Sequence, residues 1–185
     1  MDGEKLYETD VIINKPGTVG YSSGSSAAVF SDFFPIWGVT LGKTTWKQAK
    51  DMGYVVKIWE NGPGRMMDVM NVAFWDHRGS GKFTDVHWLY YHSDFPASWK
   101  SKGFSWDNSY DNWIKIFSDL GCTIKVIKAP TTKKWKGRDT LSANFEALST
   151  DGLLEFDLDF DFGENGPYTS SPKTLYSINI RYKGN

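Results

Sequence analysis

The 185-residue sequence predicts an α+β fold of two tandem units, each a helix followed by an antiparallel meander, with the helices packed on one face of the sheet. Three observations support this prediction. The segment Gly38–Lys57 recurs in altered form at Gly103–Lys125. Each copy contains a capped helical segment that stops at a glycine. The segments that follow alternate apolar and polar residues, which is typical of strands with one solvated face.

The composition is that of a folded chain without an excess of either charge. Hydrophobic residues make up 40% of the sequence and charged residues 23%, a balance typical of globular domains. The formal net charge of -1 excludes a general nucleic-acid binder, because such a protein carries a basic excess. Aromatic residues reach 16%, so large rings are expected to fill the core and to leave some area on the surface.

The single cysteine and the hydropathy pattern exclude further classes of protein. One cysteine excludes an internal disulfide framework and a cysteine-rich zinc site, and the apolar strand position of Cys122 predicts a core residue. The sequence has no apolar run of about 18 residues, so no membrane-spanning segment is expected. Its first ten residues, MDGEKLYETD, lack the pattern of a signal peptide. A lipid anchor on a longer protein stays open as an alternative.

Three parts are expected along the chain. Residues 1–37 hold a strand over 6–14 and a Gly/Ser-rich segment after it. Residues 38–102 form the first helix-plus-meander unit, and residues 103–185 form the second. The two units are expected to share one structural domain.

The first unit is predicted to begin with a helix over 44–52. Thr44 or Thr45 supplies the side-chain cap, and Gly53 permits the positive φ that suits a helix end. Three strands are expected after it, over 54–60, 68–76 and 82–91. Ile58 and Met70 are expected on the buried face of these strands.

The second unit repeats this order with a longer helix over 109–120. Asp107 or Asn108 is the predicted cap and Gly121 the predicted end, with apolar residues such as Trp113 and Phe117 on one stripe. Val126 is expected to be buried. Four strands are predicted in this unit: 122–128, 141–148, 153–162 and 174–182. The Asp151-Gly152 dipeptide predicts the hairpin turn between the second and third of them.

The alternation divides each strand into an apolar face toward the helices and a polar face toward solvent. The polar face carries tryptophan and histidine in the first unit and carboxylates in the second. A surface of this kind is typical of protein recognition. The residues predicted to contact a partner are Trp59, Trp75, Asp85, His87, Lys125, Asp157, Asp159 and Arg181.

Two other interpretations of this face stay open. Exposed tryptophans stack on sugar rings, so Trp59 and Trp75 with Asp85 and Asn71 also fit a carbohydrate-binding module. Alternatively, the tryptophans pack under the N-terminal segment as a second small core. The preferred hypothesis is a non-enzymatic binding or inhibitor-like module for an unidentified protein partner.

The acidic strand predicts neither a metal site nor a catalytic site. Glu155, Asp157, Asp159 and Asp161 occupy alternate positions, so their carboxylates form a row rather than a cage around calcium. Their solvent-facing position also opposes the burial that raises the pKa of a general acid. We therefore predict no catalytic residues, no metal and no cofactor.

The same row raises the question of how its charge is compensated. Glu146 is expected near Glu155 and Asp157 across the hairpin, and such like-charge neighbours cost stability unless a cation relieves them. Lys125 and Arg181 are the predicted cations. A bound metal or a basic partner is the rarer alternative.

Short motifs in both copies resemble those of a known architecture. They are the Gly-Val-Thr-Leu-Gly-Lys-Thr opening at Gly38–Thr44 with Met52-Gly53, and their counterparts Gly103–Ser109 and Leu120-Gly121, with the strand Tyr176–Tyr182. This pattern resembles the β-lactamase-inhibitor-like fold of secreted inhibitor proteins and small outer-membrane assembly lipoproteins. The resemblance implies a concave sheet face that binds a partner protein, and export to the periplasm or cell surface. The chain departs from the family in having one clear helix per copy and no disulfide.

Overall fold

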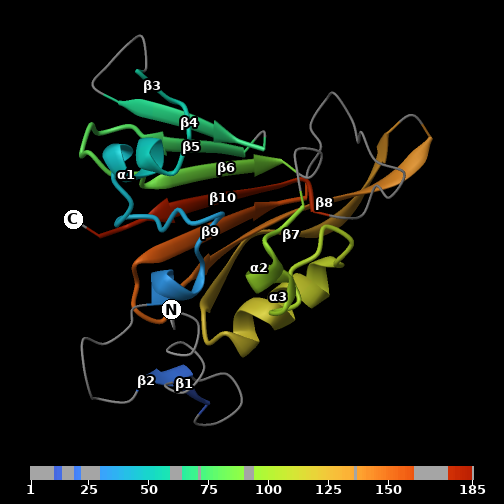
Figure 1. Cartoon of the computed structure of the whole chain (residues 1–185). Coiled ribbons are helices and arrows are strands. Elements are labelled where there is room, and N and C mark those ends of the chain that lie inside the picture. The colour runs from blue at the N-terminus through green and yellow to red at the C-terminus, as the bar shows by residue number, and fades with distance from the viewer. Residues whose placement is uncertain are drawn as a thin grey trace.

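The computed structural model describes residues 11–13, 19–21, 30–58, 64–70, 72–89, 94–135, 137–160 and 175–184. Most of this part of the chain forms one antiparallel sheet of eight strands (Figure 1). The strands are β3 (Val56–Ile58), β4 (Arg65–Val69), β5 (Val72–Asp76), β6 (Asp85–Leu89), β7 (Thr123–Trp135), β8 (Arg138–Leu148), β9 (Leu154–Asp159) and β10 (Ser177–Tyr182). They lie in the order β3-β4-β5-β6-β10-β9-β8-β7.

The remaining elements are short. β1 (Val11–Ile13) and β2 (Val19–Tyr21) form a separate two-stranded sheet, and η1 (Phe30–Phe33) is a single 3-10 turn. The α-helices are α1 (Trp46–Asp51), α2 (Ala97–Lys100) and α3 (Tyr110–Asp119). Figure 1 shows β1 and β2 away from the eight-stranded sheet.

The predicted fold of tandem helix-plus-meander units with helices packed along the sheet is wrong. The strands of both halves form one continuous sheet, because β6 pairs with β10 and brings Trp88 opposite Ile178. The helices are also too short to cover it: α1 has 6 residues, α2 has 4 and α3 has 10. Capping signals correctly mark where a helix begins, but they say nothing of how much sheet it covers or which distant strand pairs with β6.

The helix ends themselves follow local chemistry. Thr45 caps α1 through a capping box, in which its side chain accepts from the Gln48 amide and the Gln48 side chain accepts from the Thr45 amide. α3 is capped by Ser109 rather than by the predicted Asp107 or Asn108. Gly53 and Gly121 end the two helices at φ 91° and 77°, as expected for residues that leave a helix in the left-handed region.

One predicted strand and the expected burial of three residues are wrong, because alternation reveals neither turns nor sheet edges. The single strand expected over 68–76 is a hairpin of β4 and β5, which turns at Met70 with φ 49°. Met70 at this turn is 64% exposed and Ile58 on the edge strand β3 is 68% exposed, although both are expected to be buried. Val126 is likewise exposed, because it lies on β7 at the edge of the sheet.

Aromatic side chains fill the core between the sheet and the helices. Phe95 lies at its centre, with its ring centroid 4.6 Å from that of Trp106 and 4.8 Å from that of Trp88. Trp113 and Phe117 of α3 are fully buried, and Phe117 packs 4.9 Å from Phe156 of β9. The high aromatic content is thus used mainly for packing. The carboxylate of Asp151 anchors the chain beside this core by accepting from the Phe30 amide at 2.6 Å.

Candidate functional site

Strand register places the polar side chains of the sheet in rows on one face. Residues directly opposite on neighbouring strands point to the same side, so each row can be followed across the sheet. The first row is Lys57, Met66, Trp75, Asp85, Arg181, Glu155, Leu148 and Thr123. The second is Ala73, His87, Asn179, Asp157, Glu146 and Lys125. The third is Ser177, Asp159, Asn144 and Lys128.

We call the surface formed by these three rows the open face. The opposite face carries the buried residues that contact the helices, among them Phe74, Phe145 and Phe156. All of the predicted contact residues except Trp59 lie on the open face. Trp59 lies outside the described residues. Trp75, Asp85 and Arg181 are direct neighbours in the first row, whereas Lys125 lies several strands away near the other edge.

The charge of the acidic strand is compensated within the open face. Glu146 is directly opposite Asp157, which confirms the predicted like-charge pair. Lys125 Nζ lies 3.1 Å from Glu146 Oε2, and Asn144 Nδ2 donates to Asp157 Oδ1 at 2.8 Å. The carboxylate row therefore has partners from β7 and β8.

Glu155 has cations on both sides. Its Oε1 lies 3.4 Å from Arg181 Nη1, and its Oε2 lies 3.2 Å from Lys183 Nζ. Lys125 and Arg181 are thus both confirmed as compensating cations. Among the described residues, no group of three or more His, Cys, Asp or Glu side chains is placed to hold a metal ion. Asp161 lies outside those residues.

The end of the open face near β5, β6 and β10 is hollowed. Trp75 and His77 stack there with centroids 5.1 Å apart and ring planes 9° from parallel. A hollow of about 290 Å³ is lined by Trp75, His77, Asp85, His87, Asn179 and Arg181, with Val86 and Ile180. An adjoining hollow of about 300 Å³ is lined by His77, Arg78, Thr84, Asp85, Arg181, Tyr182, Lys183 and Gly184. Both contain His77, Asp85 and Arg181, and we refer to them together as the Asp85 hollow.

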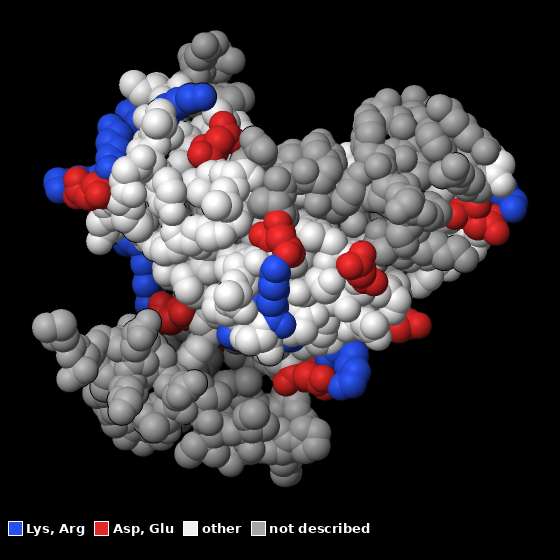
Figure 2. All heavy atoms as spheres, turned by 45° about the vertical axis from the view of Figure 1, so that its right-hand side comes forward, with Lys and Arg blue, Asp and Glu red and all other residues white. Residues whose placement is uncertain are grey.

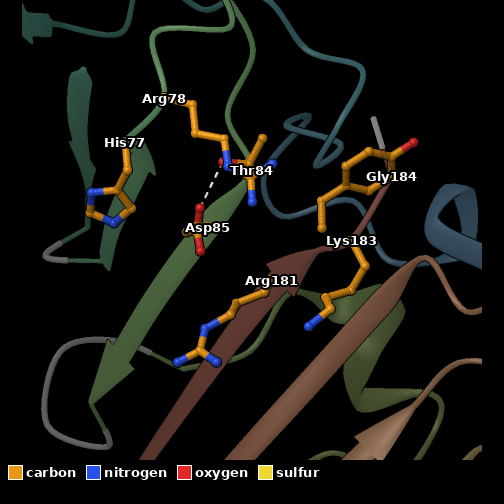
Figure 3. A pocket seen from close by; sticks show the side chains of 8 residues that line it. His77, Arg78, Thr84, Asp85, Arg181, Lys183 and Gly184 are labelled. Atoms are coloured by element: carbon orange, nitrogen blue, oxygen red, sulfur yellow. Dashed lines mark hydrogen bonds between the residues drawn. The ribbon is translucent and has the colours of Figure 1, made fainter. Parts of the chain in front are cut away.

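Figure 3 shows how charged groups surround Asp85 in the second of these volumes. Asp85 lies directly across the β6–β10 ladder from Arg181. Its Oδ2 accepts a hydrogen bond of 2.6 Å from Thr84 Oγ1, which fixes the orientation of the carboxylate. The hollow therefore combines a flat ring surface, one oriented carboxylate and several cationic groups.

The sequence did not identify His77, Arg78 or Lys183 as part of a site. Of these, His77 was detectable, because it follows Trp75 at the two-residue spacing that keeps side chains on one side of a strand. Arg78 and Lys183 meet only because β6 pairs with β10, a contact between distant parts of the chain.

Cys122 is a packing residue, as predicted. It is buried, and burial together with the nearby charge of Asp151 raises the pKa of its thiol to about 12. A thiol with so high a pKa is protonated at neutral pH and is a poor nucleophile.

The surface charges are mixed rather than segregated. In Figure 2, Lys and Arg side chains lie beside Asp and Glu side chains over the visible described surface. The pairs on the helices, Lys47 with Asp51 and Lys115 with Asp119, follow the same pattern. No helix in the described part of the chain is long and apolar enough to cross a membrane.

Comparison of the chain with protein-family models, curated proteins and solved structures finds no match.

Proposed function

We propose that this protein is a non-enzymatic binding module that recognises a partner protein through the open face. The observation that carries the proposal is the register itself, which assembles Trp75, Asp85, His87, Asp157 and Arg181 from separate strands into one continuous surface. The helices lie on the other side of the sheet, where they bury its aromatic residues.

The dimensions of the open face suit a protein partner. Eight strands about 4.8 Å apart span about 34 Å, and five residues extend for about 17 Å along each strand. The projected area is therefore roughly 600 Å², close to the roughly 800 Å² that each partner buries in a specific complex. A single small molecule would cover only a fraction of this surface.

The chemistry of the face also matches that of protein interfaces. Tryptophan and arginine are enriched among the residues that contribute most to binding. In the first row of the open face, Trp75 and Arg181 lie on either side of Asp85. The ion pair of Lys125 with Glu146 orients polar groups before binding. Oriented charges of this kind contribute mainly to specificity and to the rate of association.

Carbohydrate binding is the second candidate, and the Asp85 hollow is the observation that favours it. The stacked rings of Trp75 and His77 lie beside the polar groups of Asp85 and Asn179. Its volume of about 290 Å³ is just below the range for small-molecule pockets, roughly 300–1,000 Å³. The protein-binding proposal is preferred because it uses the whole face rather than one end.

Photo-crosslinking tests the proposal with a matched pair of positions. Lys125 on the open face and Lys115 on α3 have side chains that are 70% and 71% exposed. We expect a photoreactive residue at position 125 to crosslink a specific protein in an extract of the native cells, and the same residue at position 115 to give no such product. Crosslinking from position 115 alone would contradict the proposal.

The captured partner then allows a second measurement on Trp75. Trp75→Ala is expected to weaken binding of the partner by about 30-fold, the loss typical of an aromatic residue that contributes strongly to an interface. Lys47→Ala on α1 serves as the control and should leave the affinity unchanged. A glycan panel that yields a saturable ligand lost in Trp75→Ala, with no protein partner, would favour the carbohydrate candidate instead.

A further inference from the structure

We propose that the Asp85 hollow seats a carboxylate side chain of the partner, so that the protein selects acidic segments. The inference rests on the proposed function and specifies the chemistry of the partner at one end of the open face. Three features of the hollow support it: an excess of cationic side chains, hydrogen-bond donors that are still available, and the stacked rings beside them.

Cationic side chains outnumber carboxylates in the hollow. Arg78, Arg181 and Lys183 line it, whereas its acidic groups are Asp85 in the lining and Glu155 beside it. Arg78 forms no ion pair with any residue that the structure describes. The excess of positive charge favours an anionic group, although the chain as a whole has a net charge of -1.

The cations keep donors available for an incoming carboxylate. The guanidinium of Arg181 carries five N–H donors, and its ion pair with Glu155 is a single contact of 3.4 Å through Nη1. The ammonium group of Lys183 has three donors and contacts Glu155 at 3.2 Å. Arginine in particular binds carboxylates through two parallel hydrogen bonds, which gives the interaction a defined geometry.

Asp85 and the ring pair define how the rest of the segment is placed. Thr84 occupies Oδ2 of Asp85, so Oδ1 can accept an N–H from the backbone of a bound segment. The stacked rings of Trp75 and His77 provide a flat wall for the carbon atoms next to the carboxylate. A glutamate or aspartate side chain followed by an extended backbone satisfies all of these groups together.

Selection from a random dodecapeptide display library tests this inference. We expect the wild-type protein to enrich peptides containing Asp or Glu, and an individual enriched peptide to bind at least tenfold more weakly when its acidic residue is replaced by the corresponding amide. Arg78→Gln should weaken the affinity for the same peptide severalfold. The double variant Arg78→Gln with Arg181→Gln should abolish the enrichment of acidic peptides. Lys47→Gln, which removes an exposed charge on α1, should change neither.

A substitution at Arg78 separates loss of binding from loss of folding. Arg78 is exposed and forms no ion pair with the described residues, so its replacement should preserve the thermal unfolding midpoint even if the double variant is less stable. Enrichment without an acidic preference, or a preference unchanged in Arg78→Gln, overturns the inference but leaves the open face as a protein-binding surface. Binding of glucuronate without any enriched peptide also overturns it, because the carboxylate would then come from a glycan.

Discussion

Tyr182 links the packing of the chain to the Asp85 hollow at the level of single residues. Its ring lines the hollow and lies against two glycines, Gly42 and Gly184, at each of which an added β-carbon would overlap the ring. Its backbone amide donates to the Thr84 carbonyl at 2.6 Å. The shape of the hollow therefore depends on glycine at a position far from it in sequence.

Gly42→Ala tests this contact against a matched glycine. Gly42 has φ 76° and no room for a β-carbon, whereas Gly81 has φ 90° and open space around it. Both alanines incur the cost of the left-handed region, about 1–2 kcal/mol, but only the first also displaces the Tyr182 ring. We expect Gly42→Ala to lower the free energy of unfolding by about 3 kcal/mol and Gly81→Ala by about 1 kcal/mol in urea denaturation. Equal losses would show that the ring contact contributes nothing.

At the scale of elements, β7 forms one edge of the sheet. It runs for 13 residues and pairs with β8 on one side only, with register shifts on either side of Lys128. Lysine, proline and bulges are the features by which natural sheets prevent edge-to-edge pairing, and β7 has all three through Lys128 and Pro130. The edge is therefore protected rather than adapted for docking another strand.

Removing this protection is expected to cause self-association. In the double variant Lys128→Val and Pro130→Val, position 130 gains a backbone N–H donor. Both changes also place β-branched side chains on an exposed edge. Its sedimentation coefficient should rise with concentration more steeply than that of the wild type, while Lys47→Val on α1 should behave as the wild type does. Sedimentation of the double variant identical to that of the wild type would show that these residues do not protect the edge.

Helices and strands also differ in how far their local sequence determines them. The helices at Trp46–Asp51 and Tyr110–Asp119 were predictable because caps and terminal glycines act within a few residues. The strand predicted over 122–128 covers only the first part of β7, which continues through Pro130 to Trp135. At an edge, however, proline leaves no ladder hydrogen bond unmade on the solvent side.

The open face shows the same division between local and distant information. Alternation alone placed Asp157 and Arg181 on the solvated side, because a strand has a period of two. It could not show that Asp85 faces Arg181, since the pairing of β6 with β10 depends on contacts between distant segments. The Asp85 hollow was missed for this reason.

For the whole molecule, the eight-stranded sheet has two faces of different chemistry. One face buries the aromatic core beneath short helices and loops, with Phe95 and Trp113 among its residues. The other presents rows of polar side chains with Trp75 at the hollowed end. Compensated charges such as Lys125 with Glu146 let that face stay polar without losing stability to like-charge contacts.

Lysine footprinting of the complex tests this division most directly. Lys57 and Lys125 lie on the open face, on β3 and β7 at opposite edges of the sheet, whereas Lys47 and Lys115 lie on α1 and α3. With the crosslinked partner bound at saturation, amine labelling read by mass spectrometry should fall at Lys57 or Lys125, or at both, and stay unchanged at Lys47 and Lys115. Protection of Lys47 and Lys115 with full labelling of Lys57 and Lys125 would contradict the open face as the binding surface.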